Sequence, residues 1–492
     1  MLKLYNTLSK RLEIFKPLRD KEVRIYSCGP TVYDHPHIGN YRAFVFVDLL
    51  KRYLLWKGYR VRHVMNITDV DDKIIKKVNE SGKSLKEITR FYEAEFKRGL
   101  KELNCILADF YPRATEHIAE MQALIQKLLD RGYAYLSEDG IYYDISKFKD
   151  YGKLSGLDIA KLKAGARVAV QEYSKEQASD FVLWKAWREE DGSIFWQPEF
   201  VIDGKKIKIK GRPGWHIECS AMSMKYLGES FDIHSGGIDL IFPHHENEIA
   251  QSEAATGKRF VKYWLHNAHL IVEGKKMSKS LGNYYTLKDL LERGYSGAEI
   301  RYVLLACHYR EELNFKFSEL EAARRSIGHI IETLERLGQV GKKEVRKKGK
   351  KKNEGQGAEG VADLIKKARE EFEKAFDVDL NAPKALSVFF SFIRETNKLI
   401  DAGLLNKKEA KLLMKFIYEI DRVFGIGFEK LYKSKKKLRI PRKIRELVEK
   451  REKARKARNF ELADRLRQEI KELGWWVDDT PIGPKIKKLS EN

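Results

Sequence analysis

VRIYS (Val23–Ser27) leads into the loop CGPTVYDHPHIGN (Cys28–Asn40) and then into YRAFVFVDLLKRYLLWKG (Tyr41–Gly58). The first stretch is short, apolar and β-branched, which is typical of a buried strand, and the third is a long apolar helix ended by glycine. YRVRHVMNITD (Tyr59–Asp69) follows as a second strand. Strand, loop, helix and strand make a βαβ unit, so we predict an α/β fold with a Rossmann-type parallel sheet that binds a nucleotide.

The loop leads to a helix start near His37–Asn40. The free N–H groups and the positive dipole end of that helix suit an anion, and Gly39 lets a flat ligand approach the backbone. Taken alone, a histidine or asparagine at a helix start is more often a simple cap.

A second phosphate signal lies far downstream, in KKMSKS (Lys275–Ser280). Lys276 and Lys279, with hydroxyls between them, suit a polyphosphate, because its developing charge needs cations in the transition state. Without the earlier loop, this stretch would indicate only solvated lysines.

The chain of 492 residues is basic, with 95 Lys and Arg against 72 Asp and Glu, net +23. Residues 338–353 hold eight basic residues and one acid, and residues 431–492 hold twenty and ten, so these two stretches supply 17 of the +23. Such a balance favours a polyanionic partner. A solvated face and a solubility tail explain the charge equally well.

Helical periodicity predicts a bundle over 318–430, interrupted by a basic linker at 338–360. Beyond it we expect two helices broken near Asn459 and then a hairpin in WWVDDTPIGPKIKK. Trp475 and Trp476 suit two roles equally, namely stacking on unpaired bases and filling a small core.

The four cysteines cannot make a disulfide scaffold in a chain of this length. Neither a signal peptide nor a stretch of about 18 apolar residues occurs, so we expect a cytoplasmic protein in a reducing setting, with no membrane partner. Cys105 and Cys307 lie in apolar surroundings and are expected to pack in the core. The sequence leaves open whether His216, His245 and His269 belong to a site.

Cys28, Cys219, His244 and Glu248 make a plausible zinc set of two thiolates, one imidazole and one carboxylate. Pro243 suits the first position of a helix, which would place His244 and Glu248 on one helix face. Spacing alone does not decide the matter, because a buried cysteine is usually only a small hydrophobe.

Five blocks, in order across residues 1–290, resemble the cysteinyl-tRNA synthetase family of class I aminoacyl-tRNA synthetases: SCGPTVYDHPHIGN, NITDVDDKI, GRPGWHIECSAM, FDIHSGGIDLIFPHHENEIAQSEAATG and KMSKSLGN. ARNFELADRLRQEIKELG and DDTPIGPK near the C-terminus resemble the same family. The KMSKS signature is complete at Lys276–Ser280. The HIGH signature departs at its last position, where Asn40 can donate a hydrogen bond but carries no charge.

The resemblance implies roles for individual residues. One zinc ion per chain would be held by Cys28, Cys219, His244 and Glu248. Catalysis and ATP binding would use His37, Asn40, Lys276 and Lys279, together with Gly39 and Asp239. The substrate cysteine would lie near Thr68, Trp215 and His234.

The activity that the resemblance implies uses ATP with Mg²⁺, L-cysteine and tRNA(Cys), and we expect a monomer. Cysteine would first form cysteinyl-adenylate and pyrophosphate, and would then pass to the 3′ end of the tRNA. Zinc would bind the substrate thiolate and select against serine. Since four protein ligands close a zinc site, the substrate sulfur would be a fifth ligand or would displace Glu248.

The predicted domains follow the same resemblance. Residues 1–110 and 212–263 form the two halves of a Rossmann catalytic domain, and 111–211 form an inserted connective domain that meets the acceptor end of tRNA. Residues 264–317 hold the KMSKS loop and a junction, 318–430 form an anticodon-binding helical bundle, and 431–492 form a small basic α/β domain.

Three other functions compete with this one. A cysteine ligase of the mycothiol type shares the zinc and ATP motifs, but it lacks a basic C-terminal region. A simple nucleotidyltransferase needs neither KMSKS nor the zinc set. A non-catalytic zinc-containing RNA-binding protein does not need an intact KMSKS loop. Cysteine-dependent exchange of pyrophosphate into ATP, and transfer to tRNA, distinguish these functions.

Overall fold

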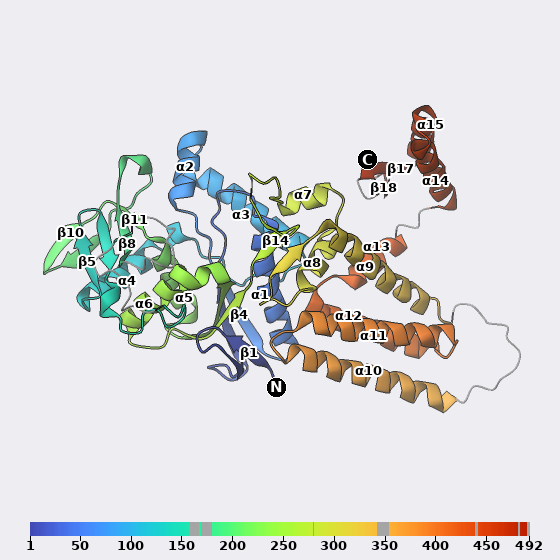
Figure 1. Ribbon diagram of the computed structural model, residues 1–492, viewed down its shortest axis with the longest axis horizontal. Coiled ribbons are helices and arrows are strands. Elements are labelled where there is room, and N and C mark those ends of the chain that lie inside the picture. Colours follow the sequence, from blue (N-terminus) through green and yellow to red (C-terminus); the bar gives the residue numbers. More distant parts are fainter. Residues whose placement is uncertain are drawn as a thin grey trace, which may run out of the picture.

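The computed structural model describes residues 1–157, 167–168, 180–278, 280–341, 354–437, 441–480 and 483–489. Figure 1 shows an elongated molecule with an inserted β-rich region at one end, a parallel sheet in the middle and a helical bundle at the other end. A small C-terminal domain lies above the bundle in this view.

The central sheet is parallel, and its strands lie in the order β13 (Val261–Asn267), β12 (Phe231–Gly237), β3 (Glu22–Ser27) and β4 (Arg60–Met65). α1 (Ile38–Trp56) connects β3 to β4. Most residues of these strands are buried, which is typical of a parallel sheet covered on both faces. The predicted βαβ unit and the α/β fold are confirmed.

The chain between β4 and β12 includes the inserted β-rich region at one end of Figure 1. It opens with α2 (Asp72–Ser81), α3 (Leu85–Glu102) and α4 (Ile118–Asp130). An antiparallel sheet follows, in the order β11 (Gly211–Pro213), β8 (Asp180–Ala186), β6 (Gly140–Tyr143) and β5 (Ala134–Ser137), with β7 (Arg167–Val168) beside β8. The hairpin of β9 (Glu199–Ile202) and β10 (Lys205–Lys208) extends from it.

Helices and short strands surround the central sheet. α5 (Trp215–Leu227) packs against β3 and β4 and also against α6 (Glu246–Thr256). β1 (Lys3–Asn6) and β2 (Arg11–Ile14) form an N-terminal hairpin beside β13. After β13 come β14 (Leu270–Val272), β15 (Lys275–Lys276), α7 (Leu287–Glu292), α8 (Gly297–Leu305) and β16 (Leu313–Phe315).

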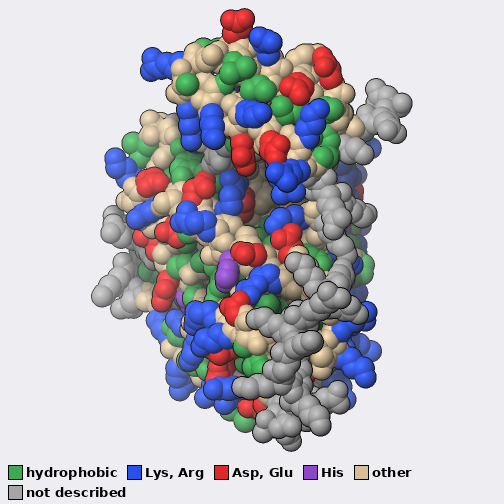
Figure 2. All heavy atoms as spheres, turned by 90° about the vertical axis from the view of Figure 1, so that its right-hand side faces the viewer, with side chains coloured by type: hydrophobic (Ala, Val, Ile, Leu, Met, Phe, Trp, Pro, Cys, Tyr) green, Lys and Arg blue, Asp and Glu red, His purple; other side chains and the backbone are tan. Residues whose placement is uncertain are grey.

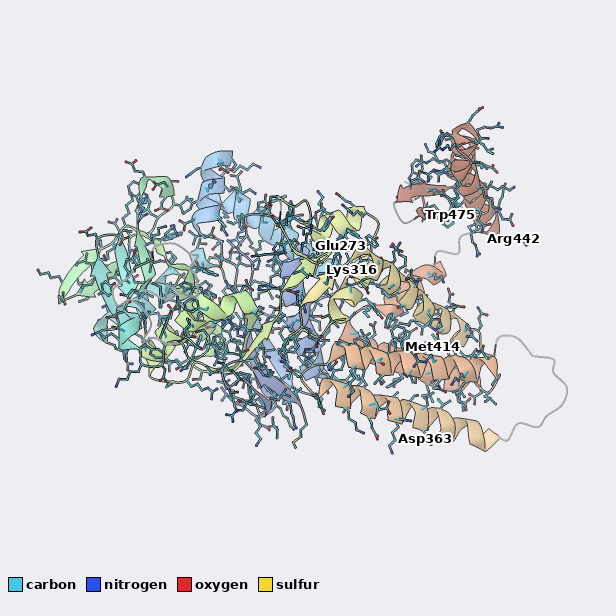
Figure 3. The ribbon with its side chains drawn as sticks, in the orientation of Figure 1. Glu273, Lys316, Asp363, Met414, Arg442 and Trp475 are labelled. Atoms are coloured by element: carbon cyan, nitrogen blue, oxygen red, sulfur yellow. The ribbon has the colours of Figure 1, made fainter. Side chains whose placement is uncertain are left out.

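The helical bundle consists of α9 (Phe317–Leu337), α10 (Glu354–Phe376), α11 (Ala382–Asp401), α12 (Lys407–Phe424) and α13 (Phe428–Lys437). Figure 3 shows α9 to α12 running side by side. The last part of the predicted linker at 338–360 is wrong, because residues 354–360 form the beginning of α10. Residues 342–353 of the same prediction lie outside the described residues.

A buried ion network joins α1 to the end of α12. Arg301 of α8 is fully buried, donates from Nε to the Phe424 carbonyl at 2.6 Å and from Nη1 to the Leu103 carbonyl at 3.0 Å, and pairs with Asp48 of α1. Asp48 also accepts from Arg52 Nε at 2.7 Å. Because a cation suits the last carbonyls of a helix, this network fixes the end of α12 against α1 and α8.

The C-terminal domain contains α14 (Arg442–Lys456), α15 (Phe460–Glu472), β17 (Trp475–Thr480) and β18 (Gly483–Lys488), so the predicted helix pair and hairpin are confirmed. Trp475 is buried in the core of this domain. Trp476 is half-buried and lies under Arg467, whose guanidinium carbon is 5.1 Å from its ring centroid. The two tryptophans therefore have different surroundings, and only Trp476 offers a ring to a partner.

Charge is mixed on the bundle end of the molecule. Figure 2 shows Lys and Arg side chains there, interspersed with Asp and Glu.

Cys105 and Cys307 are half-buried and pack against the main core, as predicted. Among the described helices, none is long and apolar enough to cross a membrane.

Candidate active site

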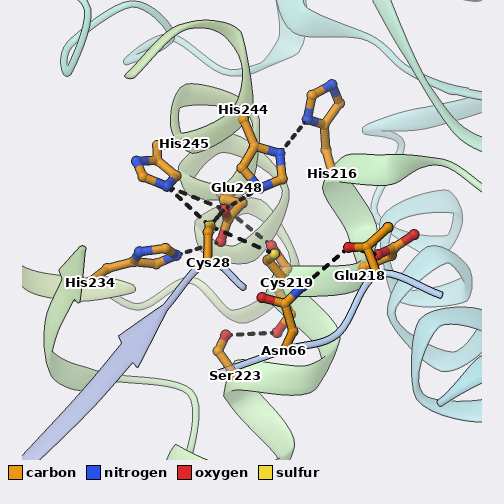
Figure 4. Close-up of polar contacts among 12 residues, drawn as sticks. Cys28, Asn66, His216, Glu218, Cys219, Ser223, His234, His244, His245 and Glu248 are labelled. Carbon is orange, nitrogen blue, oxygen red and sulfur yellow. Dashed lines mark hydrogen bonds and ion pairs between the residues drawn. The ribbon is translucent and has the colours of Figure 1, made fainter. Parts of the chain in front are cut away.

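The predicted metal ligands converge at the carboxyl edge of the central sheet. Cys28 directly follows β3, and His244 lies in a helical turn (Ile241–His245) that precedes α6. Cys219 comes from α5 and Glu248 from α6. Figure 4 shows these side chains meeting from separate elements. Residues that are far apart in the sequence meet here because the loops after parallel strands lie at this edge, which is also where doubly wound sheets bind their ligands.

Each of the four predicted ligands lies close to at least one other. Cys28 Sγ is 4.0 Å from Cys219 Sγ and 4.0 Å from Glu248 Oε1. His244 Nε2 is 3.0 Å from Glu248 Oε1. Cys219, His244 and Glu248 are buried, and Cys28 is half-buried. The structure therefore brings together all four residues that the resemblance implied.

His245 is a further donor at this site. Its Nε2 lies 3.3 Å from Cys28 Sγ and 4.0 Å from Glu248 Oε1. The ligand atoms of Cys28, His244, His245 and Glu248 all lie within 4.8 Å of one another. The Nδ1 atom of His245 is hydrogen-bonded to His266 Nε2 at 2.7 Å. The sequence left His245 open, and the structure places it against the predicted ligands.

His244 is oriented as a ligand. Its Nδ1 atom lies 2.9 Å from Nδ1 of His216, and its ring stacks on Trp215 with centroids 4.1 Å apart. Its Nε2 atom is buried and points to the other predicted ligands, 3.0 Å from Glu248 Oε1. A histidine that binds a metal through one nitrogen usually holds a hydrogen bond at the other, and His244 matches that pattern.

The prediction that Pro243 takes the first helical position is confirmed. Phe242 has an extended backbone (φ −134°, ψ 133°), the other residues of the turn Ile241–His245 have helical φ and ψ, and the turn continues into α6. His244 and Glu248 therefore face each other across one helical turn.

The electrostatics of the site favour a cation. Burial raises the pKa of Glu248, but the imidazoles of His234 and His244 outweigh it and lower the pKa to about 2. Burial also raises the pKa of Cys219, but its hydrogen bond with Cys28 and the nearby His244 lower it to about 6. Two buried anions at neutral pH therefore call for a positive partner.

The same two anions act on His244. Burial lowers the pKa of this imidazole, but Glu248 and Cys219 outweigh it and raise the pKa to about 10. By contrast, burial lowers the pKa of His216 and of His245 well below the ordinary value, so both stay neutral.

The predicted substrate residues lie around this site in different ways. His234 donates from Nε2 towards Glu248 Oε2 at 2.9 Å and stacks on Trp264. Thr68 is buried, and its hydroxyl contacts Glu218 at 2.9 Å. Asp239 is exposed in the short turn Ile238–Leu240, beside Gly237.

The predicted nucleotide site lies at the start of α1. Nδ1 of His37 accepts from the Asn40 N–H at 3.2 Å, and Oδ1 of Asn40 accepts from the His37 N–H at 3.1 Å. Both residues therefore cap the helix. The Met277 side chain lies 3.2 Å from where a Cβ on Gly39 would be, which brings the downstream lysine loop onto this helix start.

The lysine loop is held by its own asparagine. Asn283 donates to the Lys276 carbonyl at 3.1 Å and accepts from the Ser278 N–H at 2.8 Å. Lys276 ends β15 and is exposed. Lys279, the second predicted lysine, lies outside the described residues.

Comparison with known proteins adds two family matches. Residues 14–325 match the model of the tRNA synthetases class I (C) catalytic domain, and residues 371–429 match that of the DALR domain.

Curated relatives match over almost the whole chain. The cysteine–tRNA ligase of Chlamydia abortus is 45% identical over 489 residues, which cover 99% of this chain and 98% of the relative. The cysteine–tRNA ligase of Chlamydia pneumoniae is 44% identical over 493 residues, with the same coverage.

Solved structures share the fold at low identity. A methionyl-tRNA synthetase of Mycobacterium tuberculosis in complex with methionyl-adenylate has a TM-score of 0.59 at 14% identity, covering 84% of this chain and 90% of that one. A LeuRS–tRNA–LeuAMS ternary complex of Agrobacterium radiobacter has a TM-score of 0.61 at 12% identity, covering 85% and 86%.

Proposed function

This chain belongs to the cysteine–tRNA ligase family of class I tRNA synthetases, and we propose that zinc at the edge of its central sheet selects the amino acid. The enzyme uses ATP to activate L-cysteine and joins it to tRNA. The site is the observation that supports the proposal, because two thiols, an imidazole and a carboxylate meet there.

The donor set fits zinc better than the hard cations, since Mg²⁺ and Ca²⁺ prefer oxygen ligands and thiolates suit zinc. Two sulfurs bound tetrahedrally at about 2.3 Å stand roughly 3.8 Å apart, and Cys28 Sγ and Cys219 Sγ are 4.0 Å apart. When bound, zinc supplies a Lewis acid that holds a thiolate and takes a neutral hydroxyl only weakly.

Selection of cysteine over serine is the task that needs such a site. An apolar pocket separates substrates that differ by one small group by only about 1–3 kcal/mol. Cys28, Cys219, His244 and Glu248 would hold the ion, while His216 keeps the His244 ring in place through the contact between their Nδ1 atoms.

Activation is a matter of position and charge. A carboxylate oxygen of cysteine attacks the α-phosphorus of ATP, and pyrophosphate leaves with the bonding electron pair. The free N–H groups at the start of α1, with His37 and Asn40, would receive the phosphates together with Mg²⁺. Lys276 and Lys279 would neutralise the charge that develops on the leaving group. In the second step the ribose hydroxyl of the terminal adenosine attacks the carbonyl carbon, and AMP leaves.

The domains predicted from the sequence would divide the work on tRNA. The inserted region at 111–211 would meet the acceptor end. The bundle at 318–430 and the basic domain at 431–492 would hold the rest of the molecule, since phosphate contacts supply most non-specific affinity. A monomeric chain in the cytoplasm stays a prediction from the sequence.

Metal analysis of single variants tests the proposal. Cys28→Ser, Cys219→Ser, His244→Gln and Glu248→Gln should each lose most of the zinc that the wild-type chain carries. His245→Gln is the matched variant, because His245 touches the same ligands but lies outside the proposed set. Loss of zinc from His245→Gln, with zinc retained in Cys219→Ser, would contradict the proposed ligand set.

A further inference from the structure

The loop that carries Cys28 is tied to the segment after β4. The N–H of Gly29, the next residue, donates to Asn66 Oδ1 at 2.8 Å. A Cβ on Gly29 would lie 1.7 Å from the Asn66 carbonyl oxygen, so only glycine fits this close approach. The Thr68 N–H also donates to the Pro30 carbonyl at 3.1 Å. The position of Cys28 therefore follows that of residues 66–68.

The same segment is tied to the helix that carries Cys219. Asn66 Nδ2 donates to Thr68 Oγ1 at 3.2 Å, and Thr68 Oγ1 donates to Glu218 Oε2 at 2.9 Å. Glu218 directly precedes Cys219 in α5. A continuous chain of hydrogen bonds thus runs from the residue after one cysteine to the residue before the other, and Figure 4 shows Asn66 and Glu218 beside the two cysteines.

This chain of hydrogen bonds is shielded from water. Asn66, Thr68 and Glu218 are each 1% exposed. The single proton of the Thr68 hydroxyl is directed to Glu218, while its oxygen accepts from Asn66. Buried hydrogen bonds of this kind hold their geometry, because each broken link leaves a polar group without a partner.

We propose that Thr68, together with Asn66 and Glu218, is a positioning residue that sets the distance between the two cysteine ligands, an inference that rests on the proposed zinc site. The two cysteines come from a loop and a helix that are 191 residues apart, so their separation is not fixed by local backbone. The 4.0 Å between their sulfurs is close to what tetrahedral zinc requires. The hydrogen-bond chain is a buried link between these two elements that passes directly beside both ligands.

Thr68→Val tests the proposal, because it keeps the shape of the side chain and removes the hydroxyl. Zinc affinity should fall by up to about 10-fold, the lower end of the loss seen when a direct hydrogen-bond partner of a metal ligand is removed, because Thr68 acts through the residues beside the cysteines. Thr68→Ser restores the hydroxyl and should restore the affinity. The measurement is competition for zinc against a chromogenic chelator, with no substrate present, so that any contact of Thr68 with cysteine has no effect on the result.

Thr333→Val is the matched control. The Thr333 hydroxyl is likewise buried, donates to the His329 carbonyl at 3.0 Å and accepts from Asn397 at 2.9 Å, but it lies in the bundle. This variant should keep wild-type zinc affinity. An equal loss of zinc in Thr333→Val and Thr68→Val would overturn the proposal, since it would show a general effect of stability.

The remaining outcomes separate this inference from the function on which it rests. Wild-type zinc affinity in Thr68→Val would overturn the positioning role and leave the zinc site standing. A wild-type chain that takes up no zinc would overturn both. If Thr68→Val does not fold, Asn66→Ala breaks the neighbouring link, and a loss of the same size is expected.

Discussion

Asp48→Asn removes one charge from the buried network that fixes the end of α12 against α1 and α8. The Asp48 side chain is 2% exposed, and the side chain of its partner Arg301 is 0% exposed. Breaking a buried pair by removing one partner costs about 3–5 kcal/mol. The carbonyls of Phe424 and Leu103 still accept from Arg301, so the lower end, about 3 kcal/mol, is expected. At about 2.1 cal/mol/K per residue, a chain of 492 residues has an unfolding entropy of about 1 kcal/mol/K, so the unfolding temperature should fall by about 3 °C.

The assay is thermal unfolding, followed by circular dichroism at fixed ionic strength. Asp401→Asn is the control, because Asp401 forms an ion pair with Arg336 on the surface and its side chain is 68% exposed. An exposed pair contributes at most about 1 kcal/mol, so Asp401→Asn should unfold close to the wild-type temperature. Equal unfolding temperatures for the two variants would refute the reasoning that the buried network holds the bundle in place.

Three further predictions concern function. His37→Ala should slow cysteine-dependent exchange of pyrophosphate into ATP by about 10²–10³-fold, and an unchanged rate would show that His37 only caps α1. Deletion of residues 438–492 should spare this exchange but weaken the charging of tRNA, most strongly at low salt, because the phosphate contacts that are lost are the ones that salt would screen, whereas equal loss of both steps would make the C-terminal charge structural. Zinc should pass to a competing chelator as the pH falls from 7 to 5, because protons compete with the ion for His244, with a pKa of about 10, and for Cys219, with a pKa of about 6, while Glu248, with a pKa of about 2, stays ionised. A zinc content that stays constant over this range would contradict binding of the ion by imidazole and thiolate.

Local patterns were enough to predict the elements that carry the site. β3 was predicted from a short apolar run, and α1 from a longer apolar run that ends at a glycine; β4 follows that glycine. Each of these signals involves only neighbouring residues in the sequence. The helix pair and hairpin after Pro441 follow in the same way. The start of α10 was mispredicted, because apolar periodicity does not extend to residues 354–360, which the structure nevertheless shows as helix.

The site itself depends on contacts that no short pattern contains. His245 adjoins a predicted ligand in the sequence, but only the fold shows that its Nε2 atom reaches Cys28. The hydrogen-bond chain through Asn66 and Glu218 joins segments from three separate elements, so spacing along the sequence carries no signal for it. Thr68 was predicted as a site residue only because the motif NITD resembles the family. The structure adds the hydrogen bonds of its hydroxyl to Asn66 and Glu218.

The exchange of pyrophosphate into ATP with cysteine, serine or alanine, compared between the wild-type chain and Cys219→Ser, tests the central claim most directly. Zinc content is measured on the same samples. We predict exchange with cysteine and almost none with serine or alanine for the zinc-loaded wild type, and loss of both the metal and the discrimination in the variant. No exchange with cysteine in the wild type, or full metal and full discrimination against serine in Cys219→Ser, would contradict the account.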